Sequence, residues 1–199
     1  GQKDKLYYQK FGGYNASEIE VVGNLFLDEA AELFKKSKIE KKLLIKKVLF
    51  VTSPVVEDKV FGWSEDIRRD FLLNIFKILK AKKIKLTIKL HPREDPQSYK
   101  NIFKNIDRGP KIVKAKDLNH LILSSDFVIG MFSTALTNAV IMAKPIIIVD
   151  WQKIKYSEIY HKWGVARISE DVNSFRKILE DLEKGTFVKN YKLNREKFI

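Results

Sequence analysis

The sequence predicts an α/β protein with a parallel sheet of about six strands and helices on both faces. Short apolar runs rich in Val and Ile alternate with longer segments whose apolar residues recur at helical spacing, which is the pattern of βαβ units. Polar loops directly follow several of the apolar runs, as they do at the carboxyl edge of a parallel sheet. The 199 residues, of which 45% are hydrophobic, are enough for one domain with a full core.

Strands are predicted where β-branched and apolar residues dominate a short run, namely at residues 19–22, 47–52, 84–90, 111–114, 127–129, 145–149 and 165–168. Residues 23–24 read as a turn. Helices are predicted where apolar residues recur every three to four positions, namely at residues 25–36, 65–81, from 96 onward over a short stretch, 118–123, 133–143, 151–162 and 170–183. Ser64 and Asp117 are expected as N-caps. The helix at 133–143 is apolar on nearly every side, so we expect it to be buried.

These elements predict three parts of the chain. Residues 1–18 are a linker or a severed interdomain segment, residues 19–184 are an α/β domain, and residues 185–199 are a C-terminal tail. No run approaches the roughly 20 apolar residues that cross a bilayer, and no signal-peptide pattern is visible. We therefore expect a cytoplasmic protein or one held peripherally at the inner face of the membrane.

The composition excludes some chemistry and leaves other chemistry open. The chain has no Cys, so disulfides, thiolate nucleophiles and zinc–cysteine sites are excluded, and three His make a multi-histidine metal centre improbable. The net charge of +13 would attract nucleic acid, an anionic membrane surface or a phosphorylated small molecule. A solvated, lysine-rich surface of a heat-adapted protein is the alternative explanation.

His91 is the candidate catalytic residue. It follows the predicted strand 84–90, and Pro92 keeps the chain from entering a helix at once, which leaves the imidazole at the edge of the sheet. Such a histidine can donate a hydrogen bond to a phosphate oxygen or assist a leaving group, and a loop histidine that caps a neighbouring element is the alternative. Arg93 is a second candidate anion contact, unless it is a surface arginine beside Glu94.

Gly130, Ser133 and Thr134 form the second candidate segment. We expect Gly130 either to take a positive φ or to let the backbone approach a ligand closely. Ser133 and Thr134 bring hydroxyls to a helix start, where unpaired N–H groups favour phosphate, and a simple N-cap is the alternative role for Ser133.

Three further residues are candidate nucleotide or phosphate contacts. Thr52 and Ser53 follow the strand 47–52 and could line the phosphate site or the acceptor side. Asp150 ends an apolar strand, where it could accept from ribose hydroxyls or cap the next helix, and Trp151 is available to pack on a base. No metal-ligating set is predicted.

These segments resemble a known family. The stretches VLFVTSPVVED (48–58), IKLHPRED (88–95) and SSDFVIGMFSTALTNAVIMAKPIIIVD (124–150) are similar to the C-terminal, nucleotide-binding half of GT-B glycosyltransferases with an HP motif and a Ser/Thr motif. That group includes bacterial sialyltransferases, polysialyltransferases, Kdo transferases and CDP-glycerol glycerophosphotransferases. The resemblance implies a Rossmann-like donor-binding domain over 19–184, in which His91 contacts the donor phosphate and assists departure of the nucleotide while Ser133 and Thr134 grip phosphate.

Differences from the motifs of related enzyme groups narrow the range of enzymes that the chain is expected to resemble. Glycerophosphotransferases usually carry Asp-Tyr before the serines, where this chain has Met131 and Phe132, so the sialyl-like branch is favoured. The helix 134–143 lacks the Glu-rich signature of retaining enzymes, and residues 53–58 lack the His-Arg-rich loop of the non-hydrolysing epimerases.

The predicted function is that of the donor-binding domain of an inverting glycosyltransferase in surface polysaccharide biosynthesis, using a CMP-, CDP- or UDP-linked donor as substrate and no cofactor. Expected partners are that donor, an N-terminal acceptor domain outside this chain, and an anionic or membrane-associated acceptor. The isolated domain is expected to be inactive. A glycerophosphotransferase domain and a basic nucleic-acid-binding module are the alternatives, the second disfavoured because Phe71, Phe76 and Phe127 fall at core positions.

Overall fold

A computed structural model describes residues 2–22, 27–37, 45–155, 158–187 and 191–198. Its sheet has six parallel strands in the order β3-β2-β1-β4-β5-β6. The strands are β1 (Lys47–Val51), β2 (Lys85–Lys89), β3 (Lys111–Val113), β4 (Phe127–Gly130), β5 (Ile146–Val149) and β6 (Ala166–Ser169). This strand order is that of the Rossmann fold. The predicted α/β class with a parallel sheet of about six strands is confirmed.

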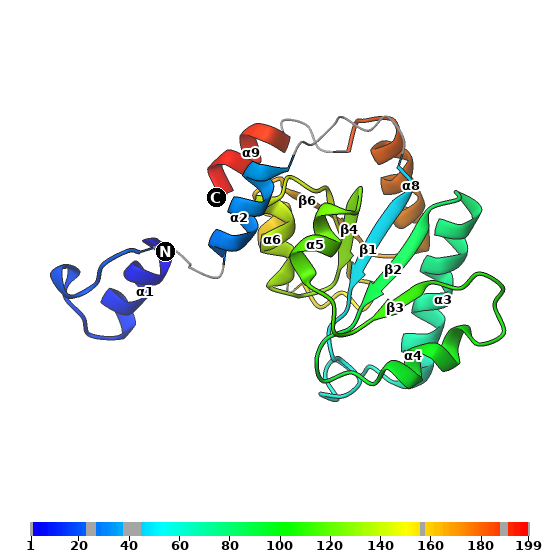
Figure 1. Cartoon of the computed structure of the whole chain (residues 1–199). Coiled ribbons are helices and arrows are strands. Elements are labelled where there is room, and N and C mark those ends of the chain that lie inside the picture. Colours follow the sequence, from blue (N-terminus) through cyan, green and yellow to red (C-terminus); the bar gives the residue numbers. More distant parts are fainter. Residues whose placement is uncertain (1, 23–26, 38–44, 156–157, 188–190, 199) are drawn as a thin grey trace.

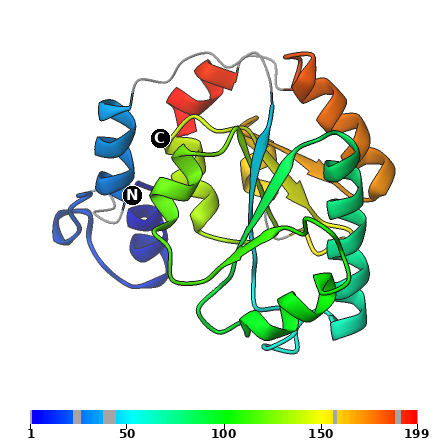
Figure 2. The ribbon, with the colours of Figure 1, turned by 45° about the vertical axis from the view of Figure 1, so that its right-hand side comes forward.

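Helices cover both faces of the sheet (Figures 1 and 2). The helices are α1 (Gln2–Phe11), α2 (Asp28–Lys36), α3 (Glu65–Ala81), α4 (Pro96–Phe103), α5 (Leu118–Leu123), α6 (Ala135–Ile141), α7 (Glu158–Lys162), α8 (Val172–Glu183) and α9 (Tyr191–Phe198), with a 3-10 turn at Ala16–Glu18. Helices α3, α4 and α8 pack on one face and α2, α5 and α6 on the other, each over its own apolar cluster.

The sequence explains where several of these helices begin and why their apolar side chains are buried. The side chains of Ser64 and Asp117 each accept a backbone N–H from the first turn of the helix that follows, which confirms the two predicted caps. Asp95 and Asp171 cap α4 and α8 in the same way. Five of the seven residues of α6 are buried, as its apolar character predicts. The aromatic side chains of Phe71, Phe76 and Phe127 are also buried, at 0–6% exposure.

The direction in which strands are added to the sheet reverses between β1 and β4, although all the strands are parallel. The first three strands build outward from β1 to β3, and the chain then returns to place β4 on the other side of β1. In open α/β sheets, ligands bind outside the carboxyl ends of the strands at such a switch point. The carboxyl ends of β1, β2 and β4 are therefore the place to look for a site.

Two predicted elements are wrong. Residues 19–22 form no strand, and Val21 and Val22 are 42% and 73% exposed, because this segment has no neighbouring strand to pair with. The helix predicted at 151–162 is limited to α7. Its first part is a loop in which Lys153 and Lys155 have positive φ, a conformation that a helix does not allow. The turn predicted at residues 23–24 lies outside the described residues.

The two terminal segments, for which no helix was predicted, contain α1 and α9. Helix α1 stands apart from the sheet in Figure 1. Helix α9 is anchored to the domain: the Tyr191 hydroxyl donates to the Lys144 carbonyl at 2.8 Å, and the Arg195 guanidinium donates to the carbonyl groups of Val140, at 2.7 Å, and Ile141. Arg195 thereby satisfies carbonyl groups at the end of α6 that have no partner within that helix.

Candidate functional site

Three loops meet at the carboxyl edge of the sheet, below the strands in Figure 1. Val51 at the end of β1 is in register with Lys89 of β2 on one side and with Gly130 of β4 on the other. The loops that follow carry Thr52, His91 and Ser133. The candidate residues of all three loops therefore open at one edge of the sheet, and the backbones after β2 and β4 are two strand spacings apart, or about 10 Å.

Side-chain hydrogen bonds join these loops. The Thr52 hydroxyl oxygen accepts the backbone N–H of His91 at 3.1 Å, which ties the loop after β1 to the loop after β2. The Ser53 hydroxyl donates to the carbonyl of Phe132 at 2.8 Å, which ties it to the loop after β4. Thr52 and Ser53 are each 4% exposed. In this structure their hydroxyls hold the site together, and their predicted contact with phosphate stays a prediction.

Glu94 is the residue that the sequence analysis missed. Its side chain is fully buried, and it accepts hydrogen bonds from the hydroxyls of Thr52 and Tyr99 and from the backbone N–H of His91. Burial raises the pKa of the Glu94 carboxyl, although the donors from Thr52, Tyr99 and His91 oppose this by favouring the charged form. No local pattern distinguishes this buried acid from its exposed neighbour Asp95, which caps α4.

The ring of His91 has a defined orientation. Its Nδ1 accepts the backbone N–H of Arg93 at 3.2 Å, so the proton of the neutral imidazole sits on Nε2. Within the described part of the chain no hydrogen bond engages Nε2. The ring is half-buried and presents this N–H as a donor at the edge of the sheet.

Arg93 lies at the surface with a side chain that is 60% exposed, and its Nη1 pairs with Asp58 at 2.7 Å. The pair joins the loop after β2 to the loop after β1. Because both groups are partly in water, the pair stabilises the fold by less than about 1 kcal/mol. A phosphate at the site would compete with Asp58 for the Arg93 guanidinium.

Gly130 is required for a reason other than the predicted positive φ, which is not observed. A Cβ at this position would lie 2.6 Å from Cδ2 of Leu136. Leu136 is fully buried in the first turns of α6, so the glycine lets α6 pack closely against the end of β4. A close approach of a ligand to Gly130 remains a prediction.

Ser133 and Thr134 come before α6 rather than in it. The Ser133 hydroxyl accepts the N–H of Ala135 at 3.3 Å, although the N-cap position of α6 is Thr134 and not Ser133, and Ser133 is half-buried. Thr134 is exposed, and its side chain makes no cap hydrogen bond. Both hydroxyls are placed at the loop that Ser53 holds, and their contact with phosphate stays a prediction.

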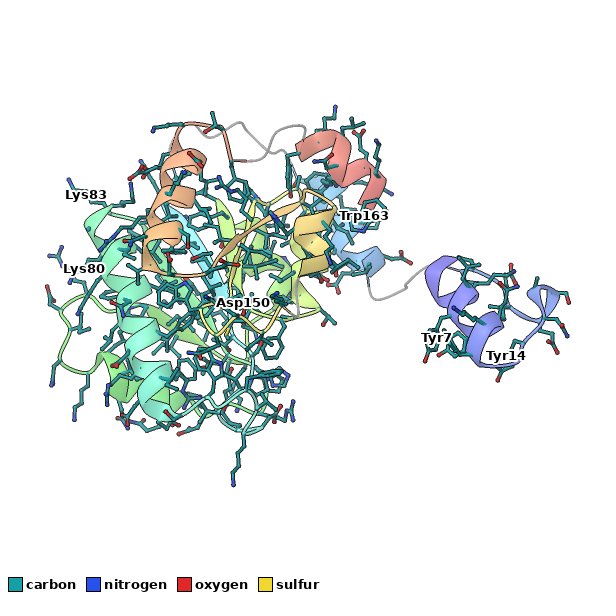
Figure 3. The ribbon with its side chains drawn as sticks, turned by 180° about the vertical axis from the view of Figure 1, so that it is seen from behind. Tyr7, Tyr14, Lys80, Lys83, Asp150 and Trp163 are labelled. Carbon is teal, nitrogen blue, oxygen red and sulfur yellow. The ribbon has the colours of Figure 1, made fainter. Side chains whose placement is uncertain are left out.

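Asp150 lies at the end of β5, and its two carboxylate oxygens accept the backbone N–H groups of Ile154 and Lys155 at 2.7 and 2.8 Å. These donors belong to the loop before α7, so Asp150 holds that loop rather than capping a helix as the alternative predicted, and a ribose would have to share these oxygens. Figure 3 shows Asp150 beside the strands. Trp151 packs edge-on against Phe71 with ring centroids 4.8 Å apart and donates to Ser169, so its ring serves the core rather than a base.

The described ranges contain neither a metal-binding cluster nor a membrane-spanning helix. No group of three or more His, Cys, Asp or Glu side chains there is arranged to hold a metal ion. None of the helices in those ranges combines the length and the apolar character that a membrane span requires.

Comparison with solved structures places the fold. The UDP-GlcNAc 2-epimerase of Methanocaldococcus jannaschii, in complex with UDP-GlcNAc and UDP, is similar over 93% of this chain and 55% of its own, with a TM-score of 0.63 and 16% identity. The wall teichoic acid polymerase TagF matches 98% of this chain and 50% of its own, with a TM-score of 0.53 and 16% identity. The spinosyn rhamnosyltransferase SpnG matches 79% of this chain and 41% of its own, with a TM-score of 0.54 and 12% identity.

The chain thus spans about half the length of these structures and has the fold of one half of a GT-B glycosyltransferase. The family described as alpha-2,8-polysialyltransferase matches residues 5–149, and the chain belongs to that family. No curated protein matches it. The predicted resemblance to one half of a GT-B glycosyltransferase, in a group that includes the polysialyltransferases, is confirmed.

Proposed function

We propose that this chain is the donor-binding half of an inverting, metal-independent glycosyltransferase that transfers a sugar acid from a nucleotide-linked donor during surface polysaccharide synthesis. The observation that carries the proposal is the joining of three carboxyl-edge loops around β1 by Thr52, Ser53 and Glu94, with the Nε2–H of His91 left as a donor. Family membership supports a sialyl-type donor, so CMP comes before CDP and UDP as the expected nucleotide.

His91 would act on the leaving group. As the bond between the sugar carbon and the phosphate oxygen breaks, negative charge grows on the departing phosphate. The Nε2–H donates a hydrogen bond to that oxygen and stabilises the charge, and the hydroxyls of Ser133 and Thr134 hold the other phosphate oxygens. The group that deprotonates the acceptor lies outside this chain in our proposal, so the isolated chain binds the nucleotide without transferring the sugar.

Calorimetric titration of the 199-residue chain with CMP, CDP and UDP tests the proposal. We expect saturable binding that is strongest for CMP and unchanged by EDTA, and we expect His91→Ala to weaken it about tenfold, the value of one hydrogen bond to a charged group. His161→Ala is the matched control, because His161 is exposed at the end of α7 and precedes β6 at the opposite edge. Absence of binding by all three nucleotides to a folded chain would contradict the proposal.

The same titration separates the alternative function. TagF shares the fold, and a glycerophosphotransferase domain would prefer the nucleotide of a CDP-linked donor. Tighter binding of CDP than of CMP, with the same dependence on His91, would favour that alternative.

A further inference from the structure

A cavity opens at the amino edge of the sheet, at the end of the strands opposite to His91 and Ser133. Its volume is about 680 Å³, and it is lined by the first residues of β1, β2 and β3, by the end of α3 and by the loops before β3 and β4. All of its charged lining residues are cations: Lys47, Lys80, Lys83, Lys85, Arg108 and Lys111. Figure 3 shows Lys80 and Lys83 together at the side of the molecule.

The sheet sets two of the lysines side by side. Lys47 and Lys85 are register partners at the starts of two adjacent parallel strands, and Lys111 starts the third strand two residues further along, in register with Thr87. All three are exposed. Strands in a sheet are about 4.8 Å apart, and like charges on adjacent strands repel each other. An anion bound between these lysines would remove that repulsion.

Two carboxylates near this cavity reduce its charge only in part. Asp107 lies 3.8 Å from Arg108 Nε, but both side chains are about 90% exposed, so water screens the pair. The Asp126 carboxylate accepts the backbone N–H groups of Lys46 and Lys47. Two carboxylates cannot balance the six cations of the lining. Lys80 donates to the Asp107 carbonyl, which leaves its positive charge uncompensated by that contact.

The chemistry of the lining selects the kind of anion. Five of the six cations are lysines, whose ammonium groups act as point charges and are common phosphate ligands. The volume is that of a small-ligand site. The Phe76 ring in the lining is 6% exposed and offers little area for the stacking of bases.

We propose that this amino-edge cavity binds a compact anion with two or more phosphate groups, at a site separate from the donor site. Several phosphate groups are needed because a single one would leave most of the six cations unsatisfied. The anion is either a free polyphosphate or the headgroup of a lipid with two phosphates. This inference does not depend on the proposed transferase function, because none of the residues that carry it belongs to the carboxyl-edge loops.

The test is a titration of the 199-residue chain with pyrophosphate, accompanied by sedimentation with vesicles of phosphatidylcholine and cardiolipin. The variant Lys85→Glu/Lys111→Glu reverses two exposed charges in the cavity. The control Lys177→Glu/Lys192→Glu makes the same change in net charge at two exposed positions of α8 and α9. We expect the cavity variant to lose at least about tenfold in affinity, the control to bind like the original chain, and affinity to fall with added salt.

The outcomes are distinguishable from those of the donor-site titration. Saturable pyrophosphate binding that depends on Lys85 and Lys111 supports a free polyphosphate, and vesicle binding with the same dependence but without pyrophosphate binding supports the lipid headgroup. Loss of pyrophosphate binding in His91→Ala but not in the cavity variant overturns the inference, and so does an equal loss in the cavity variant and the charge control. An RNA oligonucleotide that binds through the same lysines more tightly than pyrophosphate also overturns it, in favour of a nucleic-acid surface. Circular dichroism verifies that each variant is folded.

Discussion

Glu94 and His91 hold each other through two hydrogen bonds. The Glu94 carboxylate accepts the backbone N–H of His91 at 2.7 Å, and the His91 carbonyl accepts the backbone N–H of Glu94 at 3.1 Å. The four residues from His91 to Glu94 thus form a closed turn whose side-chain acceptor is fully buried. The Glu94 carboxylate therefore holds the imidazole of His91 at the edge of the sheet, and it is itself inaccessible to a ligand that binds from solvent.

Replacing Glu94 is expected to destabilise the fold. In Glu94→Gln one acceptor oxygen becomes an NH₂ group, so the donors from Thr52, Tyr99 and His91 can no longer all be satisfied, and an unsatisfied buried donor costs about 1–3 kcal/mol. Urea denaturation measures the loss. The neighbouring change Asp95→Asn is the control, because Asn caps helices as well as Asp and the loss should stay within about 0.5 kcal/mol. Equal losses in the two variants would show that Glu94 has no special structural role.

The raised pKa of Glu94 predicts a pH dependence of stability. Burial favours the protonated carboxyl in the folded chain, whereas the unfolded chain titrates near the ordinary value of 4.5. Between these two pKa values the folded state binds more protons, so this group's contribution is fully present below pH 4.5 and is lost as the pH rises through the folded pKa.

Other carboxyls obscure this effect in the chain as a whole, because the pKa values of Asp95 and Asp117 are lowered by the backbone N–H groups they accept and act with the opposite sign at lower pH. The measurement is therefore the difference in the free energy of unfolding between the original chain and Glu94→Gln, taken from pH 4.5 upward. We expect the free energy of unfolding of the original chain to fall relative to that of Glu94→Gln as the pH rises. A difference that does not change with pH would show that Glu94 has the same pKa in both states.

Gly130→Ala tests the packing of α6 on β4. The new methyl group would lie 2.6 Å from a methyl of Leu136, which is fully buried and has little room to move. Overpacking of this kind costs about 1–3 kcal/mol. Thermal unfolding measures the loss, and the double variant Gly130→Ala/Leu136→Val should recover part of it because the shorter side chain withdraws the clashing atom. If the double variant loses the sum of the single losses, the two residues do not compete for this space.

The six strands and most helices could be predicted because they depend on local patterns. The apolar runs of β1, β4 and β5 are buried on both faces, and capping residues such as Ser64 and Asp117 mark helix starts by their own side chains. Residues 19–22 show the limit of this approach. Their apolar side chains match a strand, but a strand also needs a partner, which a local pattern does not reveal.

The site could be predicted in outline for the same reason. Parallel topology alone brings His91 and Ser133 to one edge, on either side of β1. The roles of Glu94, Gly130 and Asp150 depend on tertiary contacts: a buried network, the approach of Leu136 and two backbone donors of a loop. The residue types and positions of Gly130 and Asp150 predicted ligand contacts. The structure shows that Gly130 makes room for Leu136 and that Asp150 holds the loop before α7.

The hydroxyls before α6 provide a final test of the donor site. Ser133→Ala and Thr134→Ala should each weaken nucleotide binding about tenfold if they donate to a phosphate, since a hydrogen bond to a charged group contributes about 1.5–3 kcal/mol. Thr134→Ala should leave stability unchanged because this exposed side chain caps nothing, and Ser133→Ala should cost about 1 kcal/mol through its contact with the Ala135 N–H. Titration with CMP and urea denaturation of the same samples separate the two effects. Thr186→Ala, at an exposed threonine after α8, is the matched control. Full affinity in both variants, with His91→Ala still impaired, would assign the phosphate contact to the loop after β2 alone.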